Sequence, residues 1–148
     1  MAIYAVRKRV ACYVTRTAEY GAELLVFDHA YDDPADPSGT QIPAGGMLPY
    51  EALVAAALRE TEEETGLVDL TFVSQVGAVE LGLDDPGGPS VTNFVHFEAT
   101  SDGAAAAWEH RVTGEGEDGG MVFLCRWEPL PLGFELAGDQ GRFLPTLS

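Results

Sequence analysis

Residues 50–65, YEALVAAALRETEEET, constrain the fold most strongly, because they favour an α-helix along their whole length and are followed directly by Gly66. A glycine placed just after a run of good helix formers is a typical C-terminal helix stop. We therefore predict a helix that begins at Tyr50 and ends before Gly66.

One stripe of this helix changes from apolar to acidic along its length. At 3.6 residues per turn, the stripe contains Leu53, Ala56, Ala57, Glu60, Glu63 and Glu64, whereas Glu62 points away. Carboxylates three and four positions apart repel one another and oppose the helix dipole, each at a cost of about 0.3–1 kcal/mol. If these acids only faced solvent, they would lie on the side of the helix opposite the apolar residues. We interpret the stripe as a site for a hard divalent cation such as Mg²⁺ or Mn²⁺.

The charge balance restricts the partners. The chain carries a formal net charge of −16, yet its first 18 residues hold four basic residues and no acid. Such an acidic chain does not fit general binding to nucleic acid or to an anionic membrane. If the ligand is phosphorylated, a divalent metal must supply most of the positive charge.

The rest of the chain predicts short strands separated by turns rich in Gly, Pro and Asp. Residues that favour strands occur at 8–16, 22–28, 40–42, 70–80, 90–98 and 121–127, and a loop is expected at 29–39. Residues 101–112 fit either a short helix or an extended insertion. The tail near 136–144 fits a short helix or ordered coil.

These elements fit one α/β or α+β domain spanning residues 1–148, of which 46% are hydrophobic and 22% charged. Cys12 and Cys125 lie far apart with no CxxC pattern, which favours two buried free thiols over a zinc site or a disulfide. No apolar run approaches the roughly 18 residues of a membrane span, and the N-terminus lacks the pattern of a signal peptide. We expect a soluble, cytoplasmic protein.

Residues 45–67 match the pattern G-x5-E-x7-R-E-U-x-E-E-x-G-U, in which U is aliphatic. The fixed positions are Gly45, Glu51, Arg59, Glu60, Glu63, Glu64 and Gly66, followed by Leu67. This stretch resembles the Nudix box of the Nudix hydrolases. Thr61 departs from the pattern, because an aliphatic residue is usual there. It retains a methyl group at the edge of the stripe, so we expect local repacking without loss of chemistry.

The resemblance implies a Nudix-like α/β/α sandwich with a mixed β-sheet. It also implies metal-dependent hydrolysis of a nucleoside diphosphate linked to another group X, which yields a nucleoside monophosphate and phospho-X. By the same resemblance, Glu63 and Glu64 are the principal metal ligands, and Glu60 is a further ligand or the base that accepts the proton of water. The carbonyl of Gly45 adds a ligand, and Arg59 orients Glu63.

Positions outside these ligands are more open. Many family members supply another acid from a later loop, for which Glu117 is our first choice, Glu115 the second, and Glu98 a weaker candidate. The candidate substrate contacts are Gly46, Glu51, Trp108 and Arg111. Glu51 is placed at the start of the helix, where it either supports the loop or serves the site. Trp108 and Arg111 belong to a polar and aromatic cluster that could equally be structural.

The identity of X does not follow from the sequence, because Gly82–Asp85 fill the window in which family subclasses carry a diagnostic Pro or Tyr. The alternative to an enzyme is a non-catalytic nucleotide-binding module on a Nudix fold. Such modules commonly lose a carboxylate of the box, and none is missing here. The expected partner is a nucleotide-type small molecule, with no nucleic acid or membrane, and a homodimer is left open.

Overall fold

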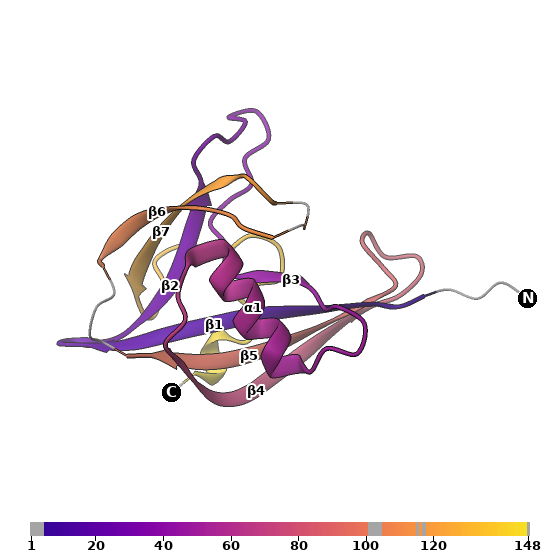
Figure 1. Ribbon diagram of the computed structural model, residues 1–148, viewed down its shortest axis with the longest axis horizontal. Helices are drawn as coiled ribbons and strands as arrows, with labels where there is room; N and C mark the ends of the chain where they lie inside the picture. Colours follow the sequence, from indigo (N-terminus) through magenta and orange to yellow (C-terminus); the bar gives the residue numbers. More distant parts are fainter. Residues whose placement is uncertain (1–4, 101–104, 115, 117, 148) are drawn as a thin grey trace, which may run out of the picture.

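One mixed β-sheet organises the molecule (Figure 1). The computed structural model describes residues 5–100, 105–114, 116 and 118–147. Its elements are β1 (Arg7–Ala18), β2 (Gly21–His29), β3 (Ala44–Gly46), α1 (Leu53–Thr65), β4 (Leu70–Leu81), β5 (Ser90–Ala99), β6 (Ala107–Arg111), β7 (Val122–Pro129) and the 3₁₀ helix η1 (Leu144–Thr146). The strand order is β4-β5-β1-β2-β7-β6, with β3 paired to β1 beside this path. Strands β1 and β5 are parallel, whereas the other pairs are antiparallel.

Strand β1 lies at the centre of the sheet and is buried on both faces. Val10, Cys12 and Val14 belong to the core cluster beneath α1, whereas Ala11 and Tyr13 belong to a second cluster on the opposite face. Because successive side chains of a strand point to opposite faces, a strand covered on both sides is apolar at nearly every position. This burial explains the continuous apolar run in the sequence.

Helix α1 covers one face of the sheet, where Ala56 and Ala57 are fully buried (Figure 1). The helix ends at Gly66 as predicted, with φ of 82° at the glycine and a hydrogen bond from its N–H to the Glu62 carbonyl of 2.9 Å. It begins three residues later than predicted. Tyr50 adopts a left-handed φ of 64°, and the Glu51 carboxylate accepts the Leu48 N–H at 2.9 Å, so these residues form a turn before the helix.

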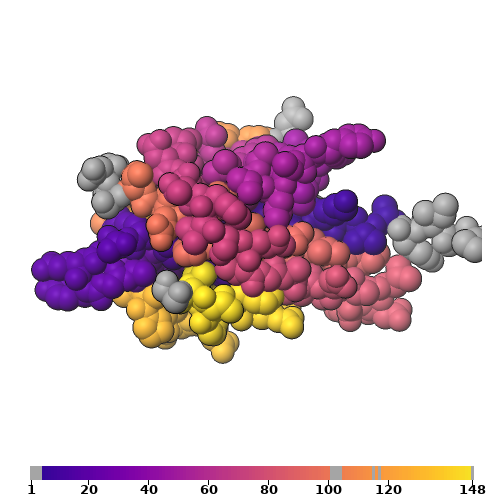
Figure 2. Space-filling model, turned by 90° about the horizontal axis from the view of Figure 1, so that it is seen from below, coloured from indigo at the N-terminus to yellow at the C-terminus, as the bar shows by residue number. Residues whose placement is uncertain are grey.

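The other face is covered by the C-terminal segment, residues 130–147, which lies opposite α1 (Figure 2). The α/β fold with a mixed sheet is therefore confirmed. This second layer differs from the expected α/β/α sandwich, because its only described helix is the 3₁₀ turn η1. Prolines and glycines interrupt the segment and disfavour a longer helix. The Phe143 N–H donates to the Tyr13 hydroxyl at 3.1 Å and ties the segment to β1.

Pairing between distant segments determines the secondary structure of two stretches that the sequence analysis left open or assigned wrongly. Residues 107–111, within the ambiguous 101–112, form β6 against β7, while 101–104 lie outside the described residues. The predicted strand at 40–42 is wrong, because Gln41 forms only an isolated bridge with Phe27 and the strand comes later, at β3. Cys12 and Cys125 are buried and free, as predicted. No helix in the described part of the chain is long and apolar enough to cross a membrane.

Candidate functional site

Strand β3, helix α1 and the loop before β7 border a cleft of about 740 Å³. The three carboxylates of the acidic stripe, Glu60, Glu63 and Glu64, all line it. The predicted phase of the helix is therefore correct, since one face of α1 carries both the packing residues and the acids. Gly45 and Gly46 line the opposite wall, because β3 pairs with β1 and is thereby held against the helix.

Arg59 lines this cleft and forms hydrogen bonds with residues of both α1 and β3. Its Nε and Nη2 donate to the two carboxylate oxygens of Glu51 at 2.8 and 3.0 Å, and Nη2 also donates to the Gly46 carbonyl at 2.9 Å. Its Nη1 donates to Glu60 at 2.9 Å and to Glu63 at 3.3 Å. The hydrogen bonds from Arg59 lower the pKa of Glu51. A planar guanidinium with five donors suits this arrangement, and a Lys ammonium could not reproduce it.

Glu64 is the most buried acid of the site, with only 3% of the residue exposed. One of its carboxylate oxygens accepts the Ala44 N–H at 3.1 Å. Burial raises the pKa of Glu64 to about 9, and the charges of Glu60, Asp118 and Glu63 add to this effect. Burial likewise raises the pKa of Glu60, although Arg59 opposes the change.

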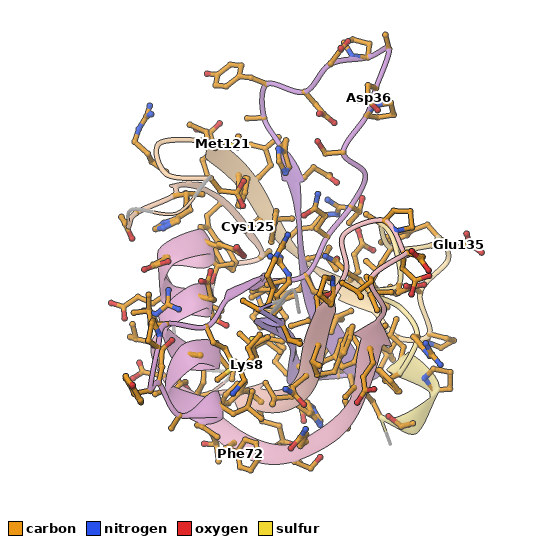
Figure 3. The ribbon with its side chains drawn as sticks, turned by 90° about the vertical axis from the view of Figure 1, so that its right-hand side faces the viewer. Lys8, Asp36, Phe72, Met121, Cys125 and Glu135 are labelled. Atoms are coloured by element: carbon orange, nitrogen blue, oxygen red, sulfur yellow. The ribbon has the colours of Figure 1, made fainter. Side chains whose placement is uncertain are left out.

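Glu64 also lies near the sulfur atoms of the core. Burial raises the pKa of the Cys125 thiol to about 12, and the Glu64 charge contributes to the shift. Figure 3 labels Cys125 beside α1, on the side of the sheet that the helix covers.

Buried carboxylates such as those of Glu60 and Glu64 are costly unless a cation compensates them. Their oxygen atoms are the donors that Mg²⁺ and Mn²⁺ prefer, so this donor set fits a hard divalent cation.

Strand β6 and Thr113, which follows it, stabilise the end of α1 that carries these acids. The Trp108 indole N–H donates to the Thr65 carbonyl at 2.8 Å, and the Thr113 N–H donates to the Glu63 carbonyl at 3.0 Å. His110 Nε2 lies 2.9 Å from the same Glu63 carbonyl. The last carbonyls of a helix have no partner within it. These contacts satisfy the carbonyls of Glu63 and Thr65 and hold the acidic turn in place.

A family model described as the NUDIX domain matches residues 6–146. The chain belongs to the Nudix family. The match extends from β1 to η1, so it includes the cleft and both layers that cover the sheet.

Solved Nudix structures share this fold at low sequence identity. The NUDIX domain of Shewanella oneidensis NrtR, complexed with ADP ribose, is 18% identical with a TM-score of 0.71, over 97% of this chain and 86% of that one. The Caenorhabditis elegans Ap4A hydrolase is 19% identical with a TM-score of 0.58, over 95% and 88%. A MutT/nudix family protein from Enterococcus faecalis is 16% identical with a TM-score of 0.63, over 97% and 61%. No curated protein sequence matches the chain significantly.

The structure brings the Nudix box together, but it does not bring in every residue that the sequence suggested. Glu51 is joined to the cleft through Arg59, and it lies before the helix instead of opening it. Trp108 and Arg111 are not among the residues that line the cleft, and the Arg111 side chain donates to the Gly120 carbonyl at 2.8 Å. Glu98 is exposed on β5 and also lies outside the lining. Glu115 and Glu117 lie outside the described residues.

Three charged residues that line the cleft were not selected from the sequence. Asp118 follows our first-choice loop acid directly, and Arg7 and Arg9 come from the basic N-terminal run. The alternate spacing of the two arginines on a predicted strand is a signal that they share one face. Within the residues that can be described, no three His, Cys, Asp or Glu side chains are arranged to hold an ion as they stand.

Proposed function

We propose that this Nudix protein is a hydrolase that depends on Mg²⁺ or Mn²⁺. It cleaves the diphosphate bond of a nucleoside diphosphate derivative and releases a nucleoside monophosphate and phospho-X. The observation that carries this proposal is the joint presence of Glu60, Glu63 and Glu64 with basic residues in one cleft. Three of the eight Lys and Arg residues of this acidic chain, Arg7, Arg9 and Arg59, line it, which suits an anionic ligand.

The residues that would hold a divalent cation are Glu60, Glu63, Glu64 and the carbonyl of Gly45, with Glu117 as the further acid proposed from the sequence. Asp118, the next residue, lines the same cleft, which supports the proposal that this loop contributes to the cation site. A bound cation would neutralise the diphosphate and activate a water molecule for attack on phosphorus. Glu60 acts as a further ligand or as the base that accepts the proton of that water.

Arg59 acts as a positioning residue in this proposal. It holds Glu51 and the Gly46 carbonyl on one side, and Glu60 and Glu63 on the other. The helix acids are thereby held against β3, and their oxygen atoms remain directed into the cleft. Charge-assisted hydrogen bonds of this kind are about twice as strong as neutral ones, so the arrangement is rigid. Gly46 and Glu51 are proposed to contribute to substrate binding through their hydrogen bonds with Arg59.

The alternative is a non-catalytic nucleotide-binding module. It is favoured by the ion pairs from Arg59 to Glu60 and Glu63, because a carboxylate that already binds an arginine is less available to a metal. A module of this kind would bind the nucleotide in the same cleft without turnover. The NrtR NUDIX domain complexed with ADP ribose shows that a protein of this fold can hold such a ligand.

A substrate panel separates the two candidates. The protein is incubated with nucleotide sugars, dinucleoside polyphosphates, NADH, ADP-ribose and nucleoside triphosphates, first with Mg²⁺ and then with Mn²⁺. Phosphate is measured after treatment with a phosphatase. We expect phosphate release above the phosphatase-only control for at least one compound. Binding without release would favour the module, and neither binding nor release with any compound would refute both functions.

A further inference from the structure

The carboxylate of Glu63 lies against a glycine outside the Nudix box. A Cβ atom built on Gly114, in the loop after β6, would lie 2.7 Å from the Glu63 carboxyl carbon and 2.7 and 3.0 Å from its two oxygen atoms. Non-bonded carbon atoms pack at roughly 3.5–4.0 Å, so these separations are too short. The Glu63 carboxylate therefore occupies the space that a side chain at position 114 would need.

Backbone hydrogen bonds hold this part of the loop against α1. Val112 exchanges hydrogen bonds with Met121 and Gly120 at 2.7 and 2.9 Å, so the pairing of β6 with β7 continues past the end of β6. The N–H of Thr113 then donates to the Glu63 carbonyl at 3.0 Å. The residue after Thr113 is therefore held close to the acidic turn of the helix.

Arg59 contacts the same carboxylate from its own helix. Its Nη1 donates to the two oxygen atoms of Glu63 at 3.4 and 3.3 Å, and the Glu63 side chain is 23% exposed. Ion pairs between residues four positions apart on a helix are weak where solvent reaches them. Arg59 alone is therefore a weak restraint on the direction of this side chain.

We infer that Gly114 is a positioning residue for Glu63. Because it has no side chain, the carboxylate can lie against the loop and remain in the cleft, which both residues line. A methyl group at position 114 would turn the carboxylate away, and the cation would lose a ligand. This inference rests on the proposed function for the cation. It adds a residue outside the Nudix box that determines where a ligand of the cation lies.

The backbone of Gly114 gives a second reason for glycine, which the test must separate from the contact. Its φ of 93° lies in a region that residues with a side chain rarely adopt. Gly120 is the matched control, because it belongs to the same loop, has φ of 86°, and is not among the described residues that line the cleft. A Cβ atom built there meets no described atom within 4 Å. Gly114→Ala and Gly120→Ala therefore share the strain, and only Gly114→Ala meets Glu63.

The first measurement is the thermal unfolding midpoint in EDTA. The Glu63 carboxylate is the free end of a flexible side chain, so it can move away from the added methyl group. We expect the midpoints of the two alanine variants to agree within a few degrees. A much lower midpoint for Gly114→Ala, or failure of that variant alone to fold, would overturn the inference, because the obstacle would then be the rigid backbone. If neither variant folds, Gly114→Asn and Gly120→Asn repeat the comparison, since asparagine tolerates positive φ better.

The second measurement is the affinity for Mn²⁺ alone, determined by calorimetry at pH 8. A cation that loses one carboxylate ligand is bound less tightly, whereas strain in the loop by itself leaves the ligands in place. We expect Gly114→Ala to bind Mn²⁺ at least tenfold more weakly than Gly120→Ala. A smaller difference would overturn the inference.

Glu63→Ala shows whether Gly114 acts through Glu63. This variant removes the carboxylate, so adding Gly114→Ala to it should weaken Mn²⁺ binding no further than adding Gly120→Ala does. A further loss that is specific to the combination with Gly114→Ala would mean that Gly114 acts on another group, and it would overturn the inference.

These readouts are stability and binding, so they separate this inference from the proposed hydrolysis. A chain that binds Mn²⁺ but hydrolyses nothing fails as the proposed enzyme, and its variants can still bear out the role of Gly114. An active chain in which the two alanine variants bind Mn²⁺ equally rejects this inference alone. Absence of Mn²⁺ binding by the unmodified chain would refute both.

Discussion

The carboxylate of Glu60 lies in the space that a side chain on Gly45 would fill. A Cβ atom built on Gly45 would come within 2.2 Å of the Glu60 carboxyl carbon. Glycine is therefore needed at this position for the helix acid to approach the strand, and the backbone of Gly45 has no positive φ that would require it for another reason. The Nudix box thus joins a residue of β3 and a residue of α1 in one contact.

Gly45→Ala should displace Glu60 or push α1 away from β3. Overpacking of this kind costs about 1–3 kcal/mol. We expect a lower free energy of unfolding in urea and a loss of most metal-dependent activity. The matched control is Gly46→Ala, where a methyl group meets no atom within 4 Å and should cost less than about 0.5 kcal/mol. Equal stability of the two variants would contradict the contact.

Glu64 should make the metal-free protein less stable as the pH rises. Its pKa is about 9 in the fold and near 4.3 in an unfolded chain, so the folded state binds more protons between these values. The stabilisation is complete below about pH 4 and is lost progressively up to about pH 9, at no more than about 1.4 kcal/mol per pH unit. Urea unfolding in EDTA from pH 5 to 9 measures this slope. Glu64→Gln should flatten it, and an identical slope in both proteins would refute the assignment.

Divalent cations should stabilise the fold, and more so at high pH, because protons compete for the same carboxylates. After EDTA treatment and dialysis, millimolar Mg²⁺ or Mn²⁺ should raise the thermal unfolding midpoint by several degrees at pH 8 and by less at pH 6. Glu63→Gln should reduce this shift. Glu62→Gln is the matched control, since Glu62 is exposed in the same turn and should leave the shift unchanged. Equal shifts in the two variants would argue against a cation at the acidic stripe.

Much of the site could be predicted from one segment, because its residues lie on a single helix. The spacing of Glu60, Glu63 and Glu64 determines their common face, and tertiary packing only had to supply the opposite wall. Thr61 shows the limit of this reasoning. It was expected at the edge of the stripe, but it is fully buried and its hydroxyl donates to the Ala57 carbonyl at 2.9 Å.

The parts that sequence reasoning missed depend on contacts between distant segments. Helix α1 begins later than predicted, and Glu51, which precedes it, instead accepts a hydrogen bond from Arg59, eight residues further along the chain. Residues 107–111 became a strand only through pairing with β7. Arg9 reaches the site because β3 pairs with that part of β1. No local propensity encodes these pairings.

Trp108 was considered as a substrate contact, and its indole N–H bonds the end of α1 at 2.8 Å. Trp108→Phe keeps an aromatic ring but removes this hydrogen bond. We expect a loss of about 1 kcal/mol in the free energy of unfolding, with KM unchanged for any compound that the panel identifies. A severalfold rise in KM without a loss of stability would instead support direct contact with the substrate.

Hydrolysis by Glu64→Gln tests the central claim most directly. Gln has nearly the shape of Glu and keeps an oxygen atom for the Ala44 N–H, so circular dichroism and the unfolding midpoint should show an intact fold. On the substrate that the unmodified chain cleaves with Mg²⁺ or Mn²⁺, we predict that kcat falls at least a hundredfold, whereas Glu62→Gln stays within threefold. Unchanged turnover in Glu64→Gln would contradict the assignment of this cleft as a metal-dependent diphosphate hydrolase.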